Sequence, residues 1–342
     1  MRSKIAIIGS GFGMYGLLPA FRRIDGCDVV SICGKNSDRM KQYCKKYNLN
    51  QYDNWKKMLH RELPDAIAIA VVPKYQYEIA KYALENGIGV FAEKPLTTSF
   101  ATSHELYSLA KKKNLPNVID FIFPEIPEWK EAHKLINSNI IGKISHINVN
   151  WKFMSYDLKN NINSWKTNID EGGGALSFYF SHIFHYLENF LGEIKNIDCM
   201  FYFSDRTINN GETGIKMNLL FEDGCEGEIN LDISYTGQQK HMLEFIGEEG
   251  SIRLENNTAN VVDGFELQIN KLNKIQKIIP KISIDIKLNK LEDHRIKSIL
   301  PLATRFIEWC NTGLKTKPDF EEGLRVQELI AIARESINNK LF

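Results

Sequence analysis

The chain has 342 residues, of which 43% are hydrophobic and 25% are charged, which is the balance of a globular protein long enough for two domains. Its 43 Lys and Arg residues nearly equal its 42 Asp and Glu residues, so we expect neither a nucleic-acid partner nor a membrane partner. Six cysteines without a CxxC pair favour reduced thiols. No apolar run is long enough for a signal peptide or a membrane span, so we expect a cytoplasmic protein.

The first third of the chain alternates apolar segments with segments of helical spacing. In chain order we predict a strand at 4–8, a helix through 22–23, a strand at 28–33, helices at 38–47 and 54–60, a strand at 66–72, a helix at 75–86, a strand at 89–92, a helix at 99–113 and a strand at 117–121. Apolar strands that alternate with helices are typical of a parallel sheet covered on both faces. We therefore predict a doubly wound α/β domain.

A glycine-rich turn with the sequence GSGFGMYG lies between the first predicted strand and the helix that follows. Glycines let a backbone approach a pyrophosphate, and the helix N-terminus supplies N–H donors. Counted from Gly9, the pattern GxGxxG places its third glycine at Met14, whereas a count from Gly11 ends on Gly16. We favour the Gly9 register, with Gly13 relieving the crowding, over a plain glycine-rich turn. The predicted contacts with the dinucleotide in this turn are Gly9, Gly11, Phe12 and Gly13.

The second predicted strand ends on residues that favour NADP(H) over NAD(H). An Asp or Glu at this point would hold the ribose 2′-hydroxyl of NAD, but the chain has Gly34, Lys35, Asn36 and Ser37 instead. Lys35 offers a positive charge, and the next two residues offer hydrogen-bond donors. The alternatives are a solvated Lys35 and a preference for NAD(H). The further predicted cofactor contacts are Val72, Pro73, Gln76, Glu93 and Lys94.

Residues 91–96 read FAEKPL and carry the Glu-Lys-Pro motif of the glucose–fructose oxidoreductase, inositol dehydrogenase and rhizopine catabolism (Gfo/Idh/MocA) family. Other segments resemble that family in the same order, namely 139–144, Trp165 with 172–176 and His182, 245–251, and 319–331 with Ser336. Because the ordered set covers nearly the whole chain, the sequence resembles the family as a whole.

The resemblance implies a Rossmann domain at 1–122 and an α/β domain for substrate and oligomerisation at 123–342, with a large, mainly antiparallel open sheet. Predicted strands at 143–153, 197–203, 216–221, 225–234 and 241–246 are consistent with it, because strands without intervening helices pair antiparallel. A C-terminal helix at 319–338 is expected near the Rossmann domain. The family often buries one face of the sheet against a second subunit, so a homo-oligomer, dimer or tetramer, is expected. We interpret 271–295 as a peripheral excursion.

The implied activity is hydride transfer between a nicotinamide and a carbon of a sugar or nucleotide-linked sugar. The substrate oxygen then needs a proton carrier and a cation beside it. By its place in the motif, Lys94 is the first candidate, and the family often has a cis peptide before Pro95; the alternative is a surface lysine paired with Glu93. His182 is the second candidate, with a packed core histidine as the alternative. The family's chemistry needs no metal, and we predict none.

The chain departs from the family at three positions near His182. The family has Asp at 178, Gly at 180 and Asp at 185, where this chain has Phe178, Phe180 and His185. Either Lys94 and His182 suffice, or Tyr179, His185 or Tyr186 replaces the carboxylate, or the pocket binds without turnover as a sensor or subunit. A reductase of a non-sugar carbonyl or imine also remains open. Because ring faces stack on sugars and bases, the predicted substrate contacts are Trp165, Phe178, Tyr179 and His185.

Overall fold

The computed structural model describes residues 2–207, 209–272, 274–280 and 286–338. They form two compact units, and each is described by itself. The first unit comprises the described residues of Met1–Ile122 and Ile286–Gln327, and the second comprises those of Phe123–Asp285 and Glu328–Phe342.

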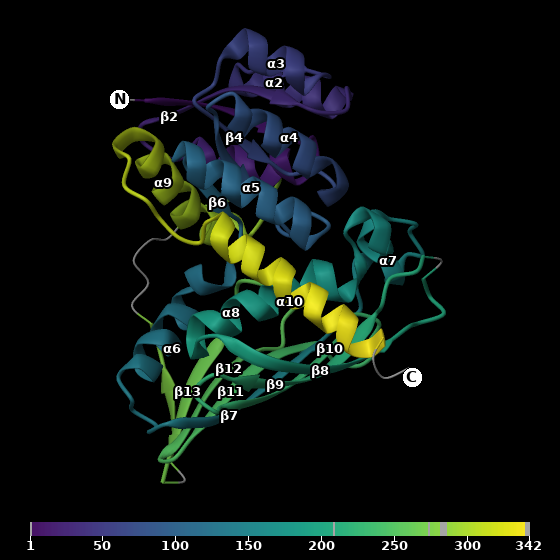
Figure 1. Ribbon diagram of the computed structural model, residues 1–342. Helices are drawn as coiled ribbons and strands as arrows, with labels where there is room; N and C mark the ends of the chain where they lie inside the picture. Colours follow the sequence, from purple (N-terminus) through teal and green to yellow (C-terminus); the bar gives the residue numbers. More distant parts are fainter. Residues whose placement is uncertain (1, 208, 273, 281–285, 339–342) are drawn as a thin grey trace. The chain divides into compact units, whose positions relative to one another are not determined.

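The first unit is built on a six-stranded parallel sheet (Figure 1). Its strands, in spatial order, are β3 (Asn50–Tyr52), β2 (Cys27–Cys33), β1 (Ser3–Ile8), β4 (Ala66–Ile69), β5 (Gly89–Ala92) and β6 (Asn117–Ile119). Every residue of β4 and β5 is buried, as expected for central strands covered on both faces. The predicted doubly wound parallel sheet is therefore confirmed, with β3 as a short polar edge strand that the apolar pattern did not predict.

Helices cover this sheet, and three of them begin at a side-chain cap. The helices are η1 (Gly13–Leu17), α1 (Leu18–Phe21), α2 (Asp38–Tyr47), α3 (Trp55–Glu62), α4 (Pro73–Glu85), α5 (Phe100–Lys113) and α9 (Ile296–Thr312). The side chains of Ser37, Asn54 and Ser99 accept N–H groups in the first turns of α2, α3 and α5. The strand predicted at 66–72 ends early because Pro73 occupies the first turn of α4.

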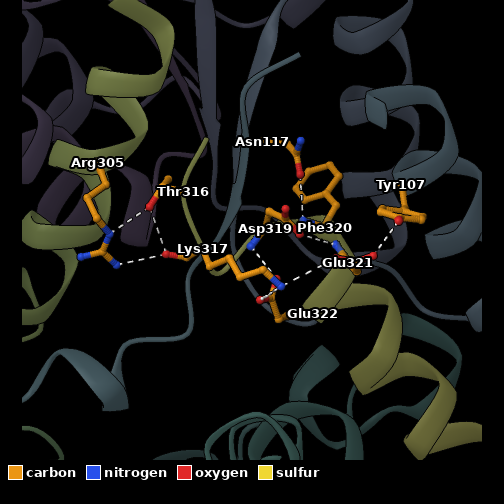
Figure 2. Close-up of polar contacts among 9 residues, drawn as sticks. All are labelled: Tyr107, Asn117, Arg305, Thr316, Lys317, Asp319, Phe320, Glu321 and Glu322. Atoms are coloured by element: carbon orange, nitrogen blue, oxygen red, sulfur yellow. Dashed lines mark hydrogen bonds and ion pairs between the residues drawn. The ribbon is translucent and has the colours of Figure 1, made fainter. Parts of the chain in front are cut away.

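The C-terminal helix α10 (Phe320–Asn338) begins in the first unit, where side chains from β6 and α5 hold its first turn (Figure 2). Asn117 Oδ1 accepts the Phe320 N–H at 2.8 Å, and Tyr107 donates to Glu321 at 2.7 Å. Glu322 Oε2 accepts the Asp319 N–H at 2.8 Å, and Asp319 Oδ1 accepts the Glu321 N–H at 2.7 Å, so side chains cap the first turn of α10. The start of α10 is therefore fixed to the sheet of the first unit.

The second unit contains an eight-stranded sheet. Its strands, in spatial order, are β14 (Lys274–Ile278), β13 (Glu266–Lys271), β12 (Gly250–Asn256), β11 (Lys240–Gly247), β7 (Ile144–Lys152), β10 (Glu226–Asp232), β9 (Gly214–Phe221) and β8 (Ile194–Tyr202). All neighbours pair antiparallel except β7 and β10, which run parallel. The predicted large, mainly antiparallel sheet is confirmed.

Helices lie on one face of this sheet (Figure 1). They are η2 (Phe123–Glu125), α6 (Pro127–Asn137), α7 (Tyr156–Lys159), η3 (Trp165–Thr167), η4 (Ile169–Glu171), η5 (Leu176–Phe180) and α8 (Ser181–Leu191). Alternate residues of β7, namely Ile147, Val149 and Trp151, are buried, while Asn148 and Asn150 between them are partly exposed. The core therefore lies on a single face, between the sheet and its helices.

The interpretation of 271–295 as a peripheral excursion is wrong at its C-terminal end. Part of the segment, 281–285, lies outside the described residues, but the residues that follow it pack on the glycine-rich turn of the first unit. Asp293 donates its N–H to the Tyr15 carbonyl at 3.2 Å, and Glu292 pairs with Arg23 at 2.7 Å. Glu292 and Asp293 are therefore partners of residues near the N-terminus, far away in the sequence, whereas Lys274, Lys277, Lys287 and Lys290 are exposed.

Candidate active site

Each glycine of the glycine-rich turn occupies its position for a different geometric reason. Gly9 has φ +130°, and a Cβ there would lie 2.2 Å from the Ala70 carbonyl oxygen. A Cβ on Gly13 would lie 3.2 Å from a methyl carbon of Ile7 in β1, so this glycine allows close packing of helix on strand. Nothing lies within 4 Å of a Cβ on Gly11, which leaves room for a ligand to approach the backbone. These contacts support the Gly9 register.

Arg295 adds a cation to this turn, and sequence reasoning missed it. Its guanidinium carbon lies 3.9 Å from the centroid of the Phe12 ring, and the group forms an ion pair with Asp293 at 2.8 Å. The ring of Phe12 fits there because Gly16 has no side chain, since a Cβ at Gly16 would lie 2.3 Å from it. No local pattern could reveal this contact, because the two residues are separated by most of the chain.

At the end of β2, Gly34 is required by packing and Lys35 is exposed. A Cβ on Gly34 would lie 2.6 Å from the Cβ of Ser10, whose hydroxyl accepts the Lys35 N–H at 3.2 Å. The hydroxyl oxygen of Ser37 accepts the Met40 N–H as the cap of α2, and the side-chain oxygen Oδ1 of Asn36 accepts from Gln51 Nε2 at 3.0 Å. Among residues 34–37, Lys35 therefore supplies an exposed positive charge.

One acidic residue at the same edge of the sheet was overlooked in the sequence. Asp53 follows β3, the strand that pairs with the end of β2. Burial, and next the charge of Asp53, raise the pKa of the Cys33 thiol to about 11. A carboxylate near the end of β2 is the feature that an NAD-specific site uses, so Asp53 opposes Lys35 in the choice of cofactor.

The Glu-Lys-Pro motif forms a loop at the carboxyl end of β5. Lys94 is 9% exposed, which excludes the alternative of a surface lysine, and the Lys94–Pro95 peptide bond is cis. The buried amide of Gln76 donates from Nε2 to the carbonyl oxygens of Glu93, Pro95 and Leu96 at 2.6, 3.1 and 3.0 Å. The loop is therefore held from α4 as well as from β4, where the Ile69 carbonyl accepts the Glu93 N–H at 3.0 Å.

Asp120, at the end of the neighbouring strand β6, brings a second buried carboxyl to this loop. It is 3% exposed, and its N–H donates to the Ala92 carbonyl at 2.9 Å. Burial and the carboxylate of Glu93 raise the pKa of Asp120 well above its ordinary value, while Arg295 and Lys94 act in the opposite direction. An Asp at the end of an apolar strand was the available signal in the sequence.

In the second unit, a glycine turn and a buried carboxylate set the start of the histidine helix. Gly174 has φ +87°, and a Cβ there would lie 2.6 Å from Oε1 of the buried Glu212. The same oxygen accepts the Leu176 N–H at 2.8 Å and lies 3.4 Å from the guanidinium of Arg334 on α10. The chain then passes through the single π-helical turn η5 into α8.

His182 and His185 lie on α8 and are 7% and 9% exposed. The edge of the His182 ring meets the Phe123 ring at 5.0 Å between centroids. Tyr186, considered as a substitute for the missing carboxylate, is fully buried, and its hydroxyl lies 3.4 Å from the ring of His241. Burial raises the pKa of Tyr186 well above its ordinary value, so it is a poor proton donor to a substrate.

The aromatic residues predicted to contact substrate form a partly exposed group in the second unit. Phe178 meets Trp165 at 5.2 Å and Tyr179 at 4.6 Å between ring centroids, both edge to face. Tyr179 in turn packs on Phe153 at 5.1 Å. Phe180, which stands where the family has Gly, does not belong to this group, because it is fully buried against Phe184.

The predicted residues therefore fall into two sets, one in each unit. The glycine turn, the end of β2, the residues around α4 and the Glu-Lys-Pro loop lie in the first unit, and both histidines with the aromatic group lie in the second. The cysteines carry thiols rather than disulfides, and burial raises the pKa of Cys27, Cys225 and Cys310 to about 12. Thiols with such a pKa are poor nucleophiles.

Two family models match the chain. Residues 3–121 match the model described as an oxidoreductase family with an NAD-binding Rossmann fold, and residues 129–253 match the model of the GFO/IDH/MocA C-terminal domain. No helix among the described residues is both long and apolar enough to span a membrane.

Individual relatives extend the similarity over the whole chain. An uncharacterized oxidoreductase of Synechocystis sp. is 25% identical over 350 residues, which cover 98% of this chain and 94% of that protein. A dTDP-3,4-didehydro-2,6-dideoxy-alpha-D-glucose 3-reductase of Actinomadura kijaniata is 26% identical over 142 residues, or 41% of this chain and 43% of the relative. A structure of levoglucosan dehydrogenase in complex with NADH matches with a TM-score of 0.86 and 18% identity over 99% of this chain and 98% of that one, which shows a shared fold.

Proposed function

Because the chain belongs to the Gfo/Idh/MocA family of oxidoreductases, we propose that it transfers a hydride between NADP(H) and a carbon of a sugar or nucleotide-linked sugar. The observation that carries this proposal is the buried Lys94, held at the carboxyl end of β5 in the same unit as the glycine turn. The names of relatives support the substrate class, since they include a dTDP-sugar reductase, an apiose dehydrogenase and a levoglucosan dehydrogenase.

The residues of the first unit fit a dinucleotide. Open space at Gly11 admits a pyrophosphate to the backbone, and Arg295 supplies a positive charge beside the same turn. The end of β2 would hold the adenosine ribose, with Lys35 on the 2′-phosphate of NADP(H). Val72 and Pro73 at the start of α4 and Glu93 after β5 complete the proposed cofactor site, and Gln76 supports it through the loop carbonyls that it binds. When bound, the nicotinamide supplies or accepts the hydride.

In the oxidation direction, the substrate hydroxyl loses its proton while its carbon loses a hydride, and reduction reverses both transfers. We assign the cation beside the oxygen to Lys94, whose charge favours the alkoxide. His182 takes the proton in oxidation and returns it in reduction, since an imidazole exchanges protons near neutral pH. Phe178, Tyr179, Trp165 and His185 would contact the sugar, the rings through its C–H face.

A non-catalytic binding protein is the second candidate, and one observation favours it. Phe178 stands where the family has a carboxylate, and a phenyl ring can neither hold a charge nor accept a proton. This candidate predicts tight NADPH binding without turnover of any keto-sugar or nucleotide sugar. The first candidate predicts turnover of at least one of them.

Substitution of Lys94 tests the proposed function. Lys94→Ala should reduce turnover by at least about 100-fold, because it removes the cation beside the reacting oxygen, while the Kd for NADPH changes by less than about 3-fold. The matched control is Lys74→Ala, an exposed lysine on α4, which should change neither quantity. Turnover would be followed by NADPH absorbance and the Kd by cofactor fluorescence. An equal loss of binding and turnover would mean that Lys94 only binds the cofactor.

The oligomeric state, the location and the roles of the two parts of the chain are further proposals. We propose a homo-oligomer, dimer or tetramer, that uses the sheet of the second unit, and a cytoplasmic location. We assign dinucleotide binding to 1–122 and substrate binding and oligomerisation to 123–342. Light scattering of the purified protein tests the oligomer, and a monomeric mass at micromolar concentration would contradict it.

A further inference from the structure

Gln76 makes an unusual set of hydrogen bonds for a residue in the first turn of a helix. Its side chain is buried, with 1% of the residue exposed, and it lies in α4 three residues after Pro73. Nε2 lies 2.6 Å from the Glu93 oxygen, 3.1 Å from the Pro95 oxygen and 3.0 Å from the Leu96 oxygen. All three acceptors are backbone carbonyls of the loop that carries Lys94.

The orientation of this amide is determined by its neighbours. Three carbonyl oxygens can face only the donor end of an amide, so Oε1 of Gln76 must point away from the loop. Oε1 is buried and has no hydrogen-bond partner among the described residues. A buried acceptor without a partner is unfavourable, so the contacts that the donor end makes with the loop outweigh the unpaired oxygen.

The bonded carbonyls lie on both sides of the lysine. The Glu93 oxygen belongs to the peptide plane that enters Lys94, and the Pro95 oxygen belongs to the plane that leaves Pro95. Only Lys94 and Pro95 lie between the two fixed planes, and the proline ring fixes one of the dihedral angles that remain. The Gln76 contacts therefore restrict the direction of the Cα–Cβ bond of Lys94, together with the Glu93 N–H that donates to the Ile69 carbonyl at 3.0 Å. A lysine has a flexible four-carbon stem, so a fixed starting direction decides where its ammonium group can reach.

A second glutamine holds the same loop without flanking the lysine. Gln327 on α10 donates from Nε2 to the Thr97 oxygen at 2.9 Å, and the first turn of α10 is bound to β6 and α5 (Figure 2). Gln327 is also buried, at 3% exposed. It provides a matched control, because its acceptor lies beyond the fixed planes around Lys94.

We propose that Gln76 is a positioning residue for Lys94, and that its amide aims the lysine at the reacting oxygen of the substrate. This inference rests on the role given to Lys94 in the proposed function. The two hydrogens of the Gln76 amide are occupied by the loop, so only Oε1 remains for any contact with the cofactor. The main contribution of Gln76 to the reaction is therefore made through the backbone of Lys94.

The test compares Gln76→Met, Gln76→Glu and Gln327→Met in the full-length protein. Methionine matches the length of glutamine without donating, so Gln76→Met should lower kcat about 10- to 100-fold and change the Kd for NADPH and the substrate KM by less than about 3-fold. Gln327→Met should lower kcat by less than about 3-fold. The basic limb of the pH profile of kcat should also shift in Gln76→Met, because the environment of the lysine changes.

Gln76→Glu supplies a readout that a packing role would not give. A protonated glutamic acid can donate to the loop carbonyls, whereas a carboxylate repels them, and burial favours the protonated form. Activity of Gln76→Glu should therefore be highest at the acid end of the range and fall as pH rises, in a region where the activity of the unsubstituted protein is level.

Three results would overturn the inference. They are an unchanged kcat in Gln76→Met, a parallel loss of NADPH affinity and kcat, and a variant that does not fold, which would give Gln76 a role in stability instead. If Lys94→Ala loses turnover while Gln76→Met keeps it, only this inference fails. If Lys94→Ala keeps turnover, the proposed function of the lysine fails as well.

Discussion

We propose that single residues decide the choice between the two cofactors and that two of them act in opposite directions. Lys35 at the end of β2 is exposed and favours a 2′-phosphate, whereas Asp53 at the end of β3 disfavours one. The sequence pattern indicated only the first, because Asp53 becomes a neighbour of β2 through the pairing of Cys33 with Tyr52. The sequence can predict the cofactor-selecting residues that directly follow β2. It cannot predict those that come from a second strand, because strand pairing brings them together.

We predict that Lys35→Ala raises the KM for NADPH about 10-fold and leaves the KM for NADH within about 2-fold, because a charged hydrogen bond to the 2′-phosphate is lost. Asp53→Asn should lower the KM for NADPH. Steady-state kinetics with both cofactors would measure the effect. The substitution of Gly34 by Asp is unsuitable here, since a Cβ would lie 2.6 Å from Ser10. An unchanged ratio of the two KM values in both variants would refute the NADP(H) assignment.

At the scale of elements, the sequence predicts most helices and strands because caps and apolar runs are local signals. Asn54 and Ser99, the first residues of two predicted helices, cap them, and Ser37 caps the helix predicted to begin at residue 38. Helix α9 was missed, although its buried residues follow helical spacing, namely Ile296, Ile299, Leu302, Ala303, Phe306 and Ile307. The ring of Phe306 in α9 packs on the ring of Phe91 in β5, with 5.8 Å between the ring centroids. This is a tertiary contact that no local pattern predicts.

The layer between the second sheet and its helices contains a buried histidine that should make this unit sensitive to acid. His241 on β11 stacks on Trp151 at 4.3 Å, and burial lowers its pKa to about 3. Its other close neighbours are Tyr186, Phe123 and Trp129, none of which is charged at neutral pH. The unfolded chain binds a proton near pH 6.5, so between about 6.5 and 3 only the unfolded state is protonated at this position.

Stability should therefore fall as pH decreases below about 6.5, with this histidine contributing up to about 1.4 kcal/mol per pH unit. His241→Phe keeps a ring on Trp151 and removes the titration, so it should flatten the dependence of the unfolding free energy on pH between 6.5 and 5. His146→Asn, at a partly exposed histidine on β7, is the control and should leave the slope unchanged. Urea unfolding at several pH values measures the slope, and an equal slope in His241→Phe would show that other groups control it.

For the whole molecule, the fold class was predictable from the sequence. Apolar strand segments and segments of helical spacing extend along the chain, and the segments that resemble the family occur in the family's order. The supporting residues of the candidate site were not predictable in the same way. Arg295 reaches Phe12, and Gln76 reaches the carbonyls around Lys94, through contacts that only the folded chain creates. The motif identified the residue that would act on substrate, while the residues that orient it are visible only in the structure.

The central claim is that a hydride passes between the nicotinamide and a carbon of a sugar. The most direct measurement uses NADPH carrying deuterium at C4 of the nicotinamide, with a panel of keto-sugars and keto nucleotide sugars, and mass spectrometry of the products. The account predicts a product alcohol that carries the deuterium on the reduced carbon, formed at least about 100-fold more slowly by Lys94→Ala. NADPH that binds tightly while no product in the panel acquires deuterium would contradict it.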